Sequence, residues 1–247
     1  MDRSLYIAMS GAKQTMLAQT SNTNNLANTQ TTGFKADLEQ FRSMPVFGPG
    51  HPTRVYAMTE RPGTDLSTGP VQTTGRSLDV VVDEAGWIAV QDKDGEEAYT
   101  KAGELRVTPQ GFLQTGTGQS VLGADGPITI PDADKIEVGT DGTISIIPAG
   151  ENALTMVSVD RIKLVKPNPK DLEKLNDGLM HLKEGSEPAL ADASIGLISG
   201  ALEGSNVSAV EALVKMIELS KHYELQVKVM KTADENSAVS TKLLQMN

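Results

Sequence analysis

Apolar residues near the N-terminus recur at alternating spacings of four and three, the period of a helix that packs along one stripe. Cap and turn residues over Asn28–Gly33 then end this pattern. The sequence therefore predicts a helix within residues 1–36, with a stripe that is apolar at first and then polar. The stripe consists of Leu5, Met9, Ala12, Met16, Gln19, Thr23 and Leu26.

A second pattern with the same spacing fills the C-terminal segment, residues 208–247. It begins at Ser208 and Glu211, which have the spacing of a capping box. A helix over this whole segment would be about three times the usual length of ~11–12 residues. Its stripe becomes small and polar toward the terminus, and it consists of Leu213, Ile217, Ser220, Tyr223, Val227, Met230, Asp234, Ser237, Thr241 and Leu244.

The residues between the two helical patterns are typical of β-structure. Short β-branched and aromatic runs alternate with turn dipeptides such as Asp94-Gly95, as in antiparallel hairpins. Leu78–Val82 is expected to pair with Trp87–Gln91 across a short turn. Asp171–Leu175 is expected to form a single helical turn.

These patterns together predict an α+β fold. Neither helix can bury its stripe alone, so we expect the long N- and C-terminal helices to pair as a coiled-coil-like core domain. A mainly antiparallel β domain, residues 75–190, is expected as an insertion between them. Residues 37–74 and 191–207 are the expected outgoing and return connectors. The polar distal stripe leaves surface for which other chains are the natural cover.

Composition and charge exclude several classes of function. The chain has 247 residues, and its 32 acidic against 22 basic side chains give a formal net charge of -10. Phosphate backbones would repel such a surface, so nucleic-acid binding is not expected. The chain has no cysteine, which excludes disulfides and thiolate metal sites. It shows neither an apolar run near the ~20 residues of a membrane helix nor the pattern of a cleavable secretory signal. Direct membrane insertion and signal-dependent export are therefore not expected.

Candidate chemistry is sparse. The three histidines, His51, His181 and His222, lie in different segments without a carboxylate at ligand spacing, so no metal site is predicted. No Gly-x-Ser-x-Gly motif occurs. The acidic run Asp92–Glu97 lacks the register and length of a calcium loop and is interpreted as a solvated hairpin. We therefore predict no catalytic residue, no cofactor and no metal.

Two other classes of function remain as alternatives. A periplasmic β-domain hydrolase would use acidic loops such as Asp92–Glu97 as paired carboxylates. An adhesin-like binding module would rest on Trp87 and the β domain. No residue spacing supports the hydrolase.

Short motifs in both terminal segments and in the middle of the chain form one ordered set. They are Ser10-Gly11-Ala12, Asn25-Leu26-Ala27-Asn28, Thr32-Gly33-Phe34-Lys35, Gly75–Val80, Tyr99–Leu105 and Glu203–Val207. In this order the motifs resemble those of the axial proteins of the bacterial flagellum, the rod and hook family. The short connector Phe41–Val46 and the segment Met216–Glu224 are most similar to the proximal rod branch. The distal rod branch, which usually has a longer segment after Gly-Phe-Lys, is the main alternative.

The resemblance implies a structural subunit of the proximal rod rather than an enzyme. Such subunits polymerise helically through their terminal helices around the export channel, and the rod transmits motor torque across the periplasm. The implied partners are other copies of this chain, other proximal and distal rod proteins, and the flagellar type III export apparatus. That apparatus would export the chain from the cytoplasm without a cleaved signal peptide.

The candidate assembly residues are taken from the two stripes and the terminal motifs. Gly33 is also expected to adopt a positive φ, because the chain must turn sharply as it leaves the first helix. The full set is Leu5, Met9, Ala12, Met16, Asn25, Leu26, Asn28, Gly33, Phe34, Asn206, Leu213, Ile217, Tyr223, Val227, Met230 and Leu244.

Overall fold

The computed structural model describes residues 4–45, 55–83, 85–150, 155–183 and 185–245. The chain divides into two compact units. One contains residues 1–28, 37–63 and 207–247 and is called here the helical unit. The other contains residues 29–36 and 64–206 and is called the β unit. The chain therefore enters and leaves the β unit more than once.

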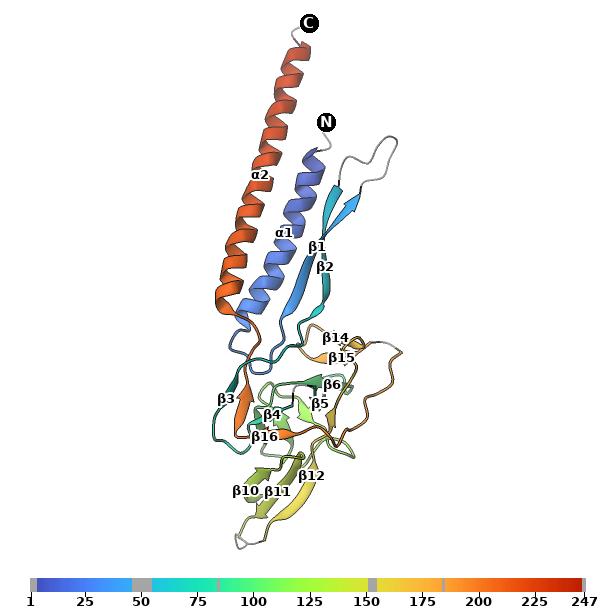
Figure 1. Ribbon diagram of the computed structural model, residues 1–247, viewed down its shortest axis with the longest axis vertical. Coiled ribbons are helices and arrows are strands. Elements are labelled where there is room, and N and C mark those ends of the chain that lie inside the picture. The colour runs from blue at the N-terminus through green and yellow to red at the C-terminus, as the bar shows by residue number, and fades with distance from the viewer. Residues whose placement is uncertain (1–3, 46–54, 84, 151–154, 184, 246–247) are drawn as a thin grey trace. The chain divides into compact units, whose positions relative to one another are not determined.

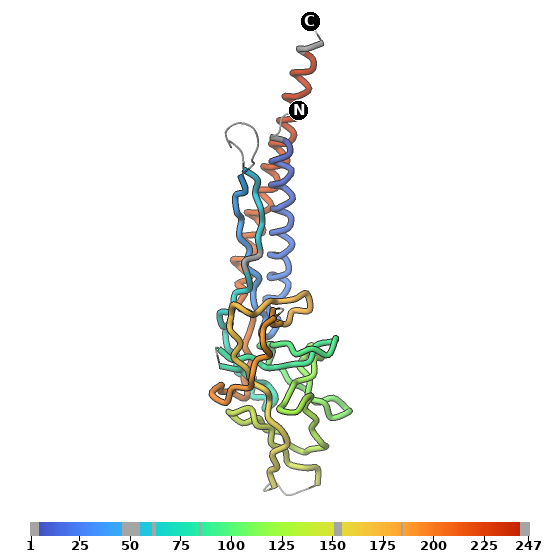
Figure 2. Tube along the Cα trace, turned by 90° about the vertical axis from the view of Figure 1, so that its right-hand side faces the viewer, coloured from blue at the N-terminus to red at the C-terminus, as the bar shows by residue number. Residues whose placement is uncertain are grey.

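The helical unit contains two helices and one two-stranded sheet. Helix α1 (Ser4–Ala27) and helix α2 (Ala209–Gln245) lie side by side and run in opposite directions (Figures 1 and 2). Strands β1 (Asp37–Pro45) and β2 (Val55–Thr64) form the sheet, and β1 contacts α1. At 1.5 Å per residue α2 is about 55 Å long, and its C-terminal part runs past the start of α1 (Figure 1).

The β unit is built from short strands in several sheets. The largest has the order β14-β15-β6-β5-β9-β8-β7, with β13 paired to β5. Strands β10, β11 and β12 form a second sheet, and β16-β4 and β17-β3 form two small ones. The strand bounds are β3 Val71–Thr73, β4 Val80–Val82, β5 Trp87–Gln91, β6 Glu97–Thr100, β7 Leu105–Val107, β8 Leu113–Thr115, β9 Ser120–Val121, β10 Ala133–Val138, β11 Thr143–Pro148, β12 Val157–Arg161, β13 Leu164–Val165, β14 Leu172–Lys174, β15 Met180–Leu182, β16 Leu197–Ser199 and β17 Ala201–Glu203.

Two clusters of buried side chains form the core of the β unit. The larger is aliphatic and includes Val80, Ile88 and Leu113. The smaller surrounds Trp87 and Tyr99 on the other side of β5 and β6. Because side chains alternate along a strand, adjacent residues of β5 serve both clusters.

The predicted fold class was wrong. Only two helices occur in the part of the chain that the structure describes, most of its elements are strands in several sheets, and no coiled-coil core is present. Met9 and Met16 of the predicted stripe do not line the contact between the helices, because their exposed fractions are 52% and 56%. The buried face of α1 is instead small or polar, and it consists of Ala8, Gly11, Ala12, Thr15, Ala18, Asn22 and Asn25.

Two local predictions in the β unit were also wrong. Strand β4 does not pair with β5 but with β16, in the register Val82↔Leu197. Asp171–Leu175 contains the strand β14, which pairs with β15, rather than a helical turn. The partner of β4 is distant in sequence, and the partner of β14 is the next strand of the sheet. In both cases the local residue pattern does not reveal this pairing.

Candidate assembly site

The contact between α1 and α2 is close and partly polar. A Cβ added at Gly11 would lie 3.1 Å from the side-chain amide of Gln226 on α2. The Asn22 side chain donates a hydrogen bond of 2.7 Å to the carbonyl of Ala212. Small residues therefore allow the helices to approach, and a buried amide fixes their register, since an unpaired buried amide is costly.

Asn25 joins the end of α1 to the following strand. Its Nδ2 donates to the carbonyl of Asp37 at 2.9 Å, and its Oδ1 accepts from the Asp37 N–H at 3.0 Å. An amide can donate and accept at once, which an ionised carboxylate cannot do. Gln14 also binds strand β2: its Oε1 accepts from the Thr59 N–H at 3.0 Å, and its backbone carbonyl accepts from the Thr59 hydroxyl at 3.2 Å.

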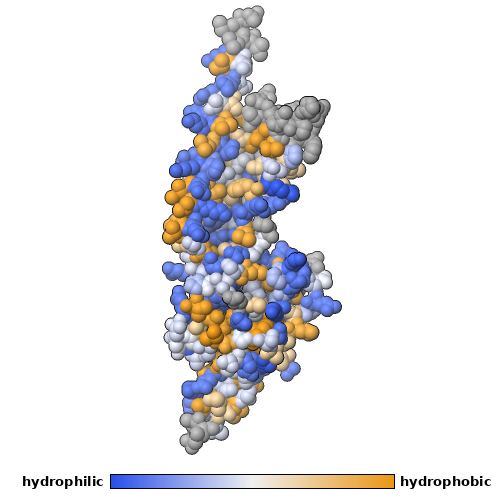
Figure 3. Space-filling view, viewed as in Figure 1, coloured by the Kyte–Doolittle hydropathy of each residue, from blue (hydrophilic) through white to orange (hydrophobic). Residues whose placement is uncertain are grey.

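Both helices carry a second apolar face that the helical unit does not cover. The exposed fractions are 50% for Tyr6 and 50% for Leu17 on α1, and 71% for Val210 and 57% for Ile217 on α2. A helix turns about 100° per residue, so these residues lie roughly across each helix from its buried stripe. Figure 3 shows apolar side chains gathered over the first turns of α2, at the left margin of the view.

In the β unit, the segment after α1 and the segment before α2 are bonded to each other. The Gly33 N–H donates to the carbonyl of Glu203 at 2.8 Å, and the Asn206 N–H donates to the carbonyl of Phe34 at 3.3 Å. Gly33 has a φ of 67°, and a Cβ at this position would lie 2.3 Å from the carbonyl carbon of Lys101. The predicted positive φ is confirmed.

Asn206 holds together three ends of the β unit. Its Oδ1 accepts from the Ala36 N–H at 2.7 Å, and its Nδ2 donates to the carbonyl of Asp65 at 2.9 Å. The Asp65 N–H in turn donates to the carbonyl of Ala36 at 2.8 Å. One amide therefore fixes the backbone near three of the four ends of this unit's two chain segments, 29–36 and 64–206.

A buried group of charges lies behind this junction. Lys35 Nζ is 2.6 Å from Glu203 Oε1, and Lys101 Nζ is 4.0 Å from Glu203 Oε2, with all three side chains at most 3% exposed. Lys35 also donates to the carbonyl of Ser67 at 2.7 Å, and Lys101 donates to the carbonyl of Asp83 at 2.9 Å. The two buried ammonium groups share one carboxylate, and each also has a backbone carbonyl as a hydrogen-bond acceptor. Such partners offset the cost of burying a charge.

Phe34 is covered by a fourth charged side chain. Lys174 Nζ lies 3.8 Å from the centre of the Phe34 ring and donates to the carbonyl of Lys35 at 2.8 Å. Such a cation–π contact contributes about 0.5–2 kcal/mol. Lys174 belongs to β14, so this contact ties the Gly-Phe-Lys segment to the edge strand of the largest sheet.

Comparisons with known proteins match both the C-terminal segment and the β-rich middle of the chain. Residues 198–243 match the family model "Flagellar basal body rod FlgEFG protein C-terminal", and residues 81–146 match "Flagellar hook protein FlgE/F/G D1 domain". The chain is 40% identical to the flagellar basal-body rod proteins FlgF of Escherichia coli K12 and Salmonella typhimurium LT2, over the full length of both chains in each case.

The chain belongs to the flagellar basal-body rod protein family. It is 32% identical to the rod protein FlgG of Bacillus subtilis, over 94% of this chain and 96% of that protein. The sequence favoured the proximal rod protein, FlgF, over the distal rod protein, FlgG, and the higher identity to FlgF confirms that choice. The prediction of a structural protein rather than an enzyme is confirmed as well, because these relatives are rod proteins.

The structure places the sixteen predicted assembly residues of this rod-family chain in three different settings. Ala12 and Asn25 are buried in the helical unit, and Leu5, Leu26, Asn28 and Met230 are half-buried there. Gly33, Phe34 and Asn206 form the junction in the β unit. The side chain of Leu244 lies outside the described residues. The exposed members are Met9, Met16, Leu213, Ile217, Tyr223 and Val227.

Sequence reasoning missed the residues that the rod-family fold places behind the junction. Lys35, Lys101 and Glu203 stood inside the recognised motifs, but nothing in their spacing showed that they meet. Lys174 lies outside every motif. No sequence pattern signalled a buried charge, because the segment Ala98–Leu105 around Lys101 is of mixed polarity and lysine is rarely fully buried unless paired.

Proposed function

We propose that this chain is a structural subunit of the flagellar basal-body rod that polymerises by packing the outer faces of α1 and α2 against neighbouring subunits. The neighbours would be other copies of this chain and other rod proteins. Its relatives are named as proteins of the basal-body rod. In such a rod, the subunit would transmit mechanical load rather than bind a small molecule.

The exposed apolar faces of the two helices carry this proposal. Soluble monomers rarely expose large contiguous apolar patches, yet α2 alone presents Val210, Leu213, Val214 and Ile217 within its first turns. The area left exposed on Ile217, 57% of the side chain, would contribute about 1–1.5 kcal/mol on burial. Several such residues on each helix provide enough apolar area for a lateral contact between subunits.

The distal part of α2 supports an assembled state in another way. From Lys231 to Lys242 every residue except Ala233 is exposed, and Val239 is 57% exposed. A helical segment as short as residues 231–242 is only marginally stable in water unless one of its faces is packed. We infer that neighbouring subunits supply this packing in the rod.

The family also suggests how the chain reaches its site. We infer that it is exported by the flagellar type III apparatus and that the assembled rod lies in the periplasm. None of the described helices is long and apolar enough to cross a membrane.

A charge on the apolar face of α2 tests the proposal. Ile217→Asp should abolish motility and rod growth in a strain that depends on this gene, because an unpaired carboxylate at a packed contact costs several kcal/mol. His222→Asp is the matched control, since it adds the same charge to an exposed position on the same helix, away from Val210, Leu213 and Ile217. Both variants should leave the far-UV circular dichroism of the monomer unchanged.

The comparison between the two variants decides the outcome. Normal swimming by the Ile217→Asp strain, with rods present in purified basal bodies, would exclude this face as an assembly contact. Equal loss of motility in both variants would show that added charge, rather than the apolar face, disturbs the helix.

A further inference from the structure

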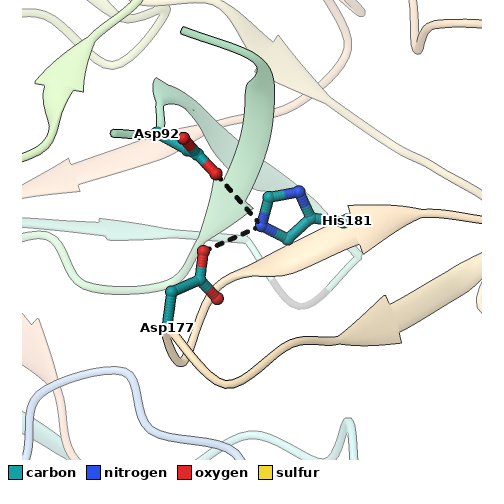
Figure 4. A group of neighbouring side chains, drawn as sticks. All are labelled: Asp92, Asp177 and His181. Atoms are coloured by element: carbon teal, nitrogen blue, oxygen red, sulfur yellow. Dashed lines mark hydrogen bonds and ion pairs between the residues drawn. The ribbon is translucent and has the colours of Figure 1, made fainter. Parts of the chain in front are cut away.

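In the β unit, the fold brings together one imidazole and two carboxylates, those of His181, Asp177 and Asp92. The sequence pattern did not predict this group. His181 lies on β15, Asp177 lies in the turn between β14 and β15, and Asp92 follows β5 (Figure 4). The Nε2 atom of His181 is 2.9 Å from Asp177 Oδ2 and 3.9 Å from Asp92 Oδ2. All three residues belong to the β unit.

His181 is buried and Asp92 is half-buried, whereas Asp177 lies at the surface. The exposed fractions of the side chains are 9% for His181, 11% for Asp92 and 29% for Asp177. Among the residues with described side chains, it is the one group of three or more histidine, aspartate or glutamate side chains whose ligand atoms converge, all within 4.8 Å of one another.

The three side chains are held in position by their own strands and turns. Asp92 Oδ1 accepts a hydrogen bond from the Asp94 N–H, and Asp177 Oδ1 accepts one of 2.9 Å from the Leu179 N–H. In each aspartate one oxygen therefore fixes the turn and the other faces the imidazole. Sheet pairing on both sides of β15 sets the backbone at His181, through Glu173↔His181 and Met180↔Tyr99.

The ligand atoms suit a divalent transition-metal ion. Zn²⁺ binds imidazole nitrogen and carboxylate oxygen at about 2.0–2.2 Å, and in a tetrahedral site two ligands then lie about 3.4 Å apart. The observed separations of 2.9 and 3.9 Å lie on either side of that value. All three ligand atoms lie within 4.8 Å of one another, so modest side-chain movements would place them around one ion, with a water as the fourth ligand.

We propose that Asp92, Asp177 and His181 bind one divalent transition-metal ion, for which Zn²⁺ is the test case. The ion replaces the proton between the imidazole and the carboxylates, and it offsets the charge of two neighbouring aspartates. It links the β5–β6 turn to the β14–β15 hairpin, two elements about 85 residues apart in the chain. Its role is to stabilise the β unit, because any ligand that binds only the folded state stabilises that state.

Zinc titration of the full-length chain, freed of metal with a chelator, tests this proposal directly. Calorimetry should detect one Zn²⁺ site per chain. Asp177→Asn and His181→Gln should each weaken binding by at least about a hundredfold, since even residues that only support ligands cost roughly 10–100-fold when replaced. Asp94→Asn is the matched control: it removes a carboxylate from the same turn that lies outside the group, and binding should be unchanged.

Two further measurements keep the proposal testable if a variant folds poorly. In the wild-type chain, Co²⁺ should give the visible absorption of a four- or five-coordinate ion, and Zn²⁺ should displace it. Zn²⁺ should also raise the melting temperature reported by Trp87, the only tryptophan, which lies on neighbouring β5. Absence of saturable Zn²⁺ binding in the wild type, or equal binding in the Asp177, His181 and Asp94 variants, would overturn the proposal.

Discussion

Replacement of Gly33 by alanine should destabilise the β unit for two separable reasons. Gly33 has a φ of 67°, which an L-residue adopts at a cost of about 1–2 kcal/mol. The new Cβ would also lie 2.3 Å from Lys101 C and 2.4 Å from Ala102 N. These are backbone atoms of a buried segment, so no side chain can rotate away to relieve the contact.

The expected loss of stability follows from these contacts. Forcing an extra methyl group into a packed site costs about 1–3 kcal/mol. Any shift of the segment also weakens the 2.8 Å hydrogen bond from Gly33 to Glu203, which contributes about 1 kcal/mol. Together with the cost of the positive φ, the free energy of unfolding should fall by about 3–5 kcal/mol. For a unit of this size that corresponds to a decrease in melting temperature of roughly 10 °C.

Two other glycines separate the two causes. Gly75 has a φ of 75° with nothing within 4 Å of an added Cβ, so Gly75→Ala should show only the conformational cost. Gly103 does not have a positive φ, but its Cβ would lie 1.7 Å from the carbonyl oxygen of Val80, so Gly103→Ala should show only the steric cost.

Trp87 makes the measurement specific to the β unit. It is the only tryptophan of the chain and is 5% exposed, so its fluorescence follows unfolding of that unit, while far-UV circular dichroism also follows the helices. Gly33→Ala should melt well below Gly75→Ala in the fluorescence signal. Equal melting temperatures for these two variants would refute the argument from close approach to Lys101.

Two other predictions concern buried ionisable groups in the β unit. Burial, with Glu97 nearby, raises the pKa of Tyr99 to about 12, so the folded state retains the phenol proton more tightly than the unfolded chain, whose tyrosines titrate near ~10. Stability should therefore fall as the pH rises from about 10 to about 12, and urea unfolding followed by Trp87 fluorescence should show this slope reduced in Tyr99→Phe; an unchanged slope would exclude Tyr99 as its cause. Glu203→Gln should lower the free energy of unfolding by about 3–5 kcal/mol because it leaves Lys35 and Lys101 buried without their carboxylate. Glu137→Gln, which breaks an exposed pair with Lys135, should change it by no more than about 1 kcal/mol, and equal effects of the two variants would contradict the importance of burial.

The sequence alone determined the two helices, the β-rich middle and the family. Periodicity predicted both helices because spacings of three and four are local properties of the chain. The positive φ of Gly33 was predictable for the same reason, since cap and turn residues over Asn28–Gly33 require a sharp turn. The family followed from short motifs whose order along the chain is itself a sequence property.

The sequence did not determine which faces of the helices pack together. A stripe through Met9 and Met16 has the right spacing, but so does the neighbouring stripe through Ala8, Thr15 and Ala18. Hydrophobicity favours the first, whereas the structure buries the second and leaves the methionines exposed. Close approach of two helices requires small residues, and this preference appears only when the partner helix is in place.

Tertiary structure alone brought together the charged and polar groups of the β unit. Lys35 and Glu203 are 168 positions apart, and Asp92 lies far from His181 in the chain. Long-range strand pairing such as β17 with β3 and β15 with β6 positions these residues. Such pairing depends on which strands are buried beside each other, whereas spacing along the chain reports only what lies within a few residues. The helices could therefore be predicted from local patterns, but the buried ion pairs and the histidine–aspartate group could not.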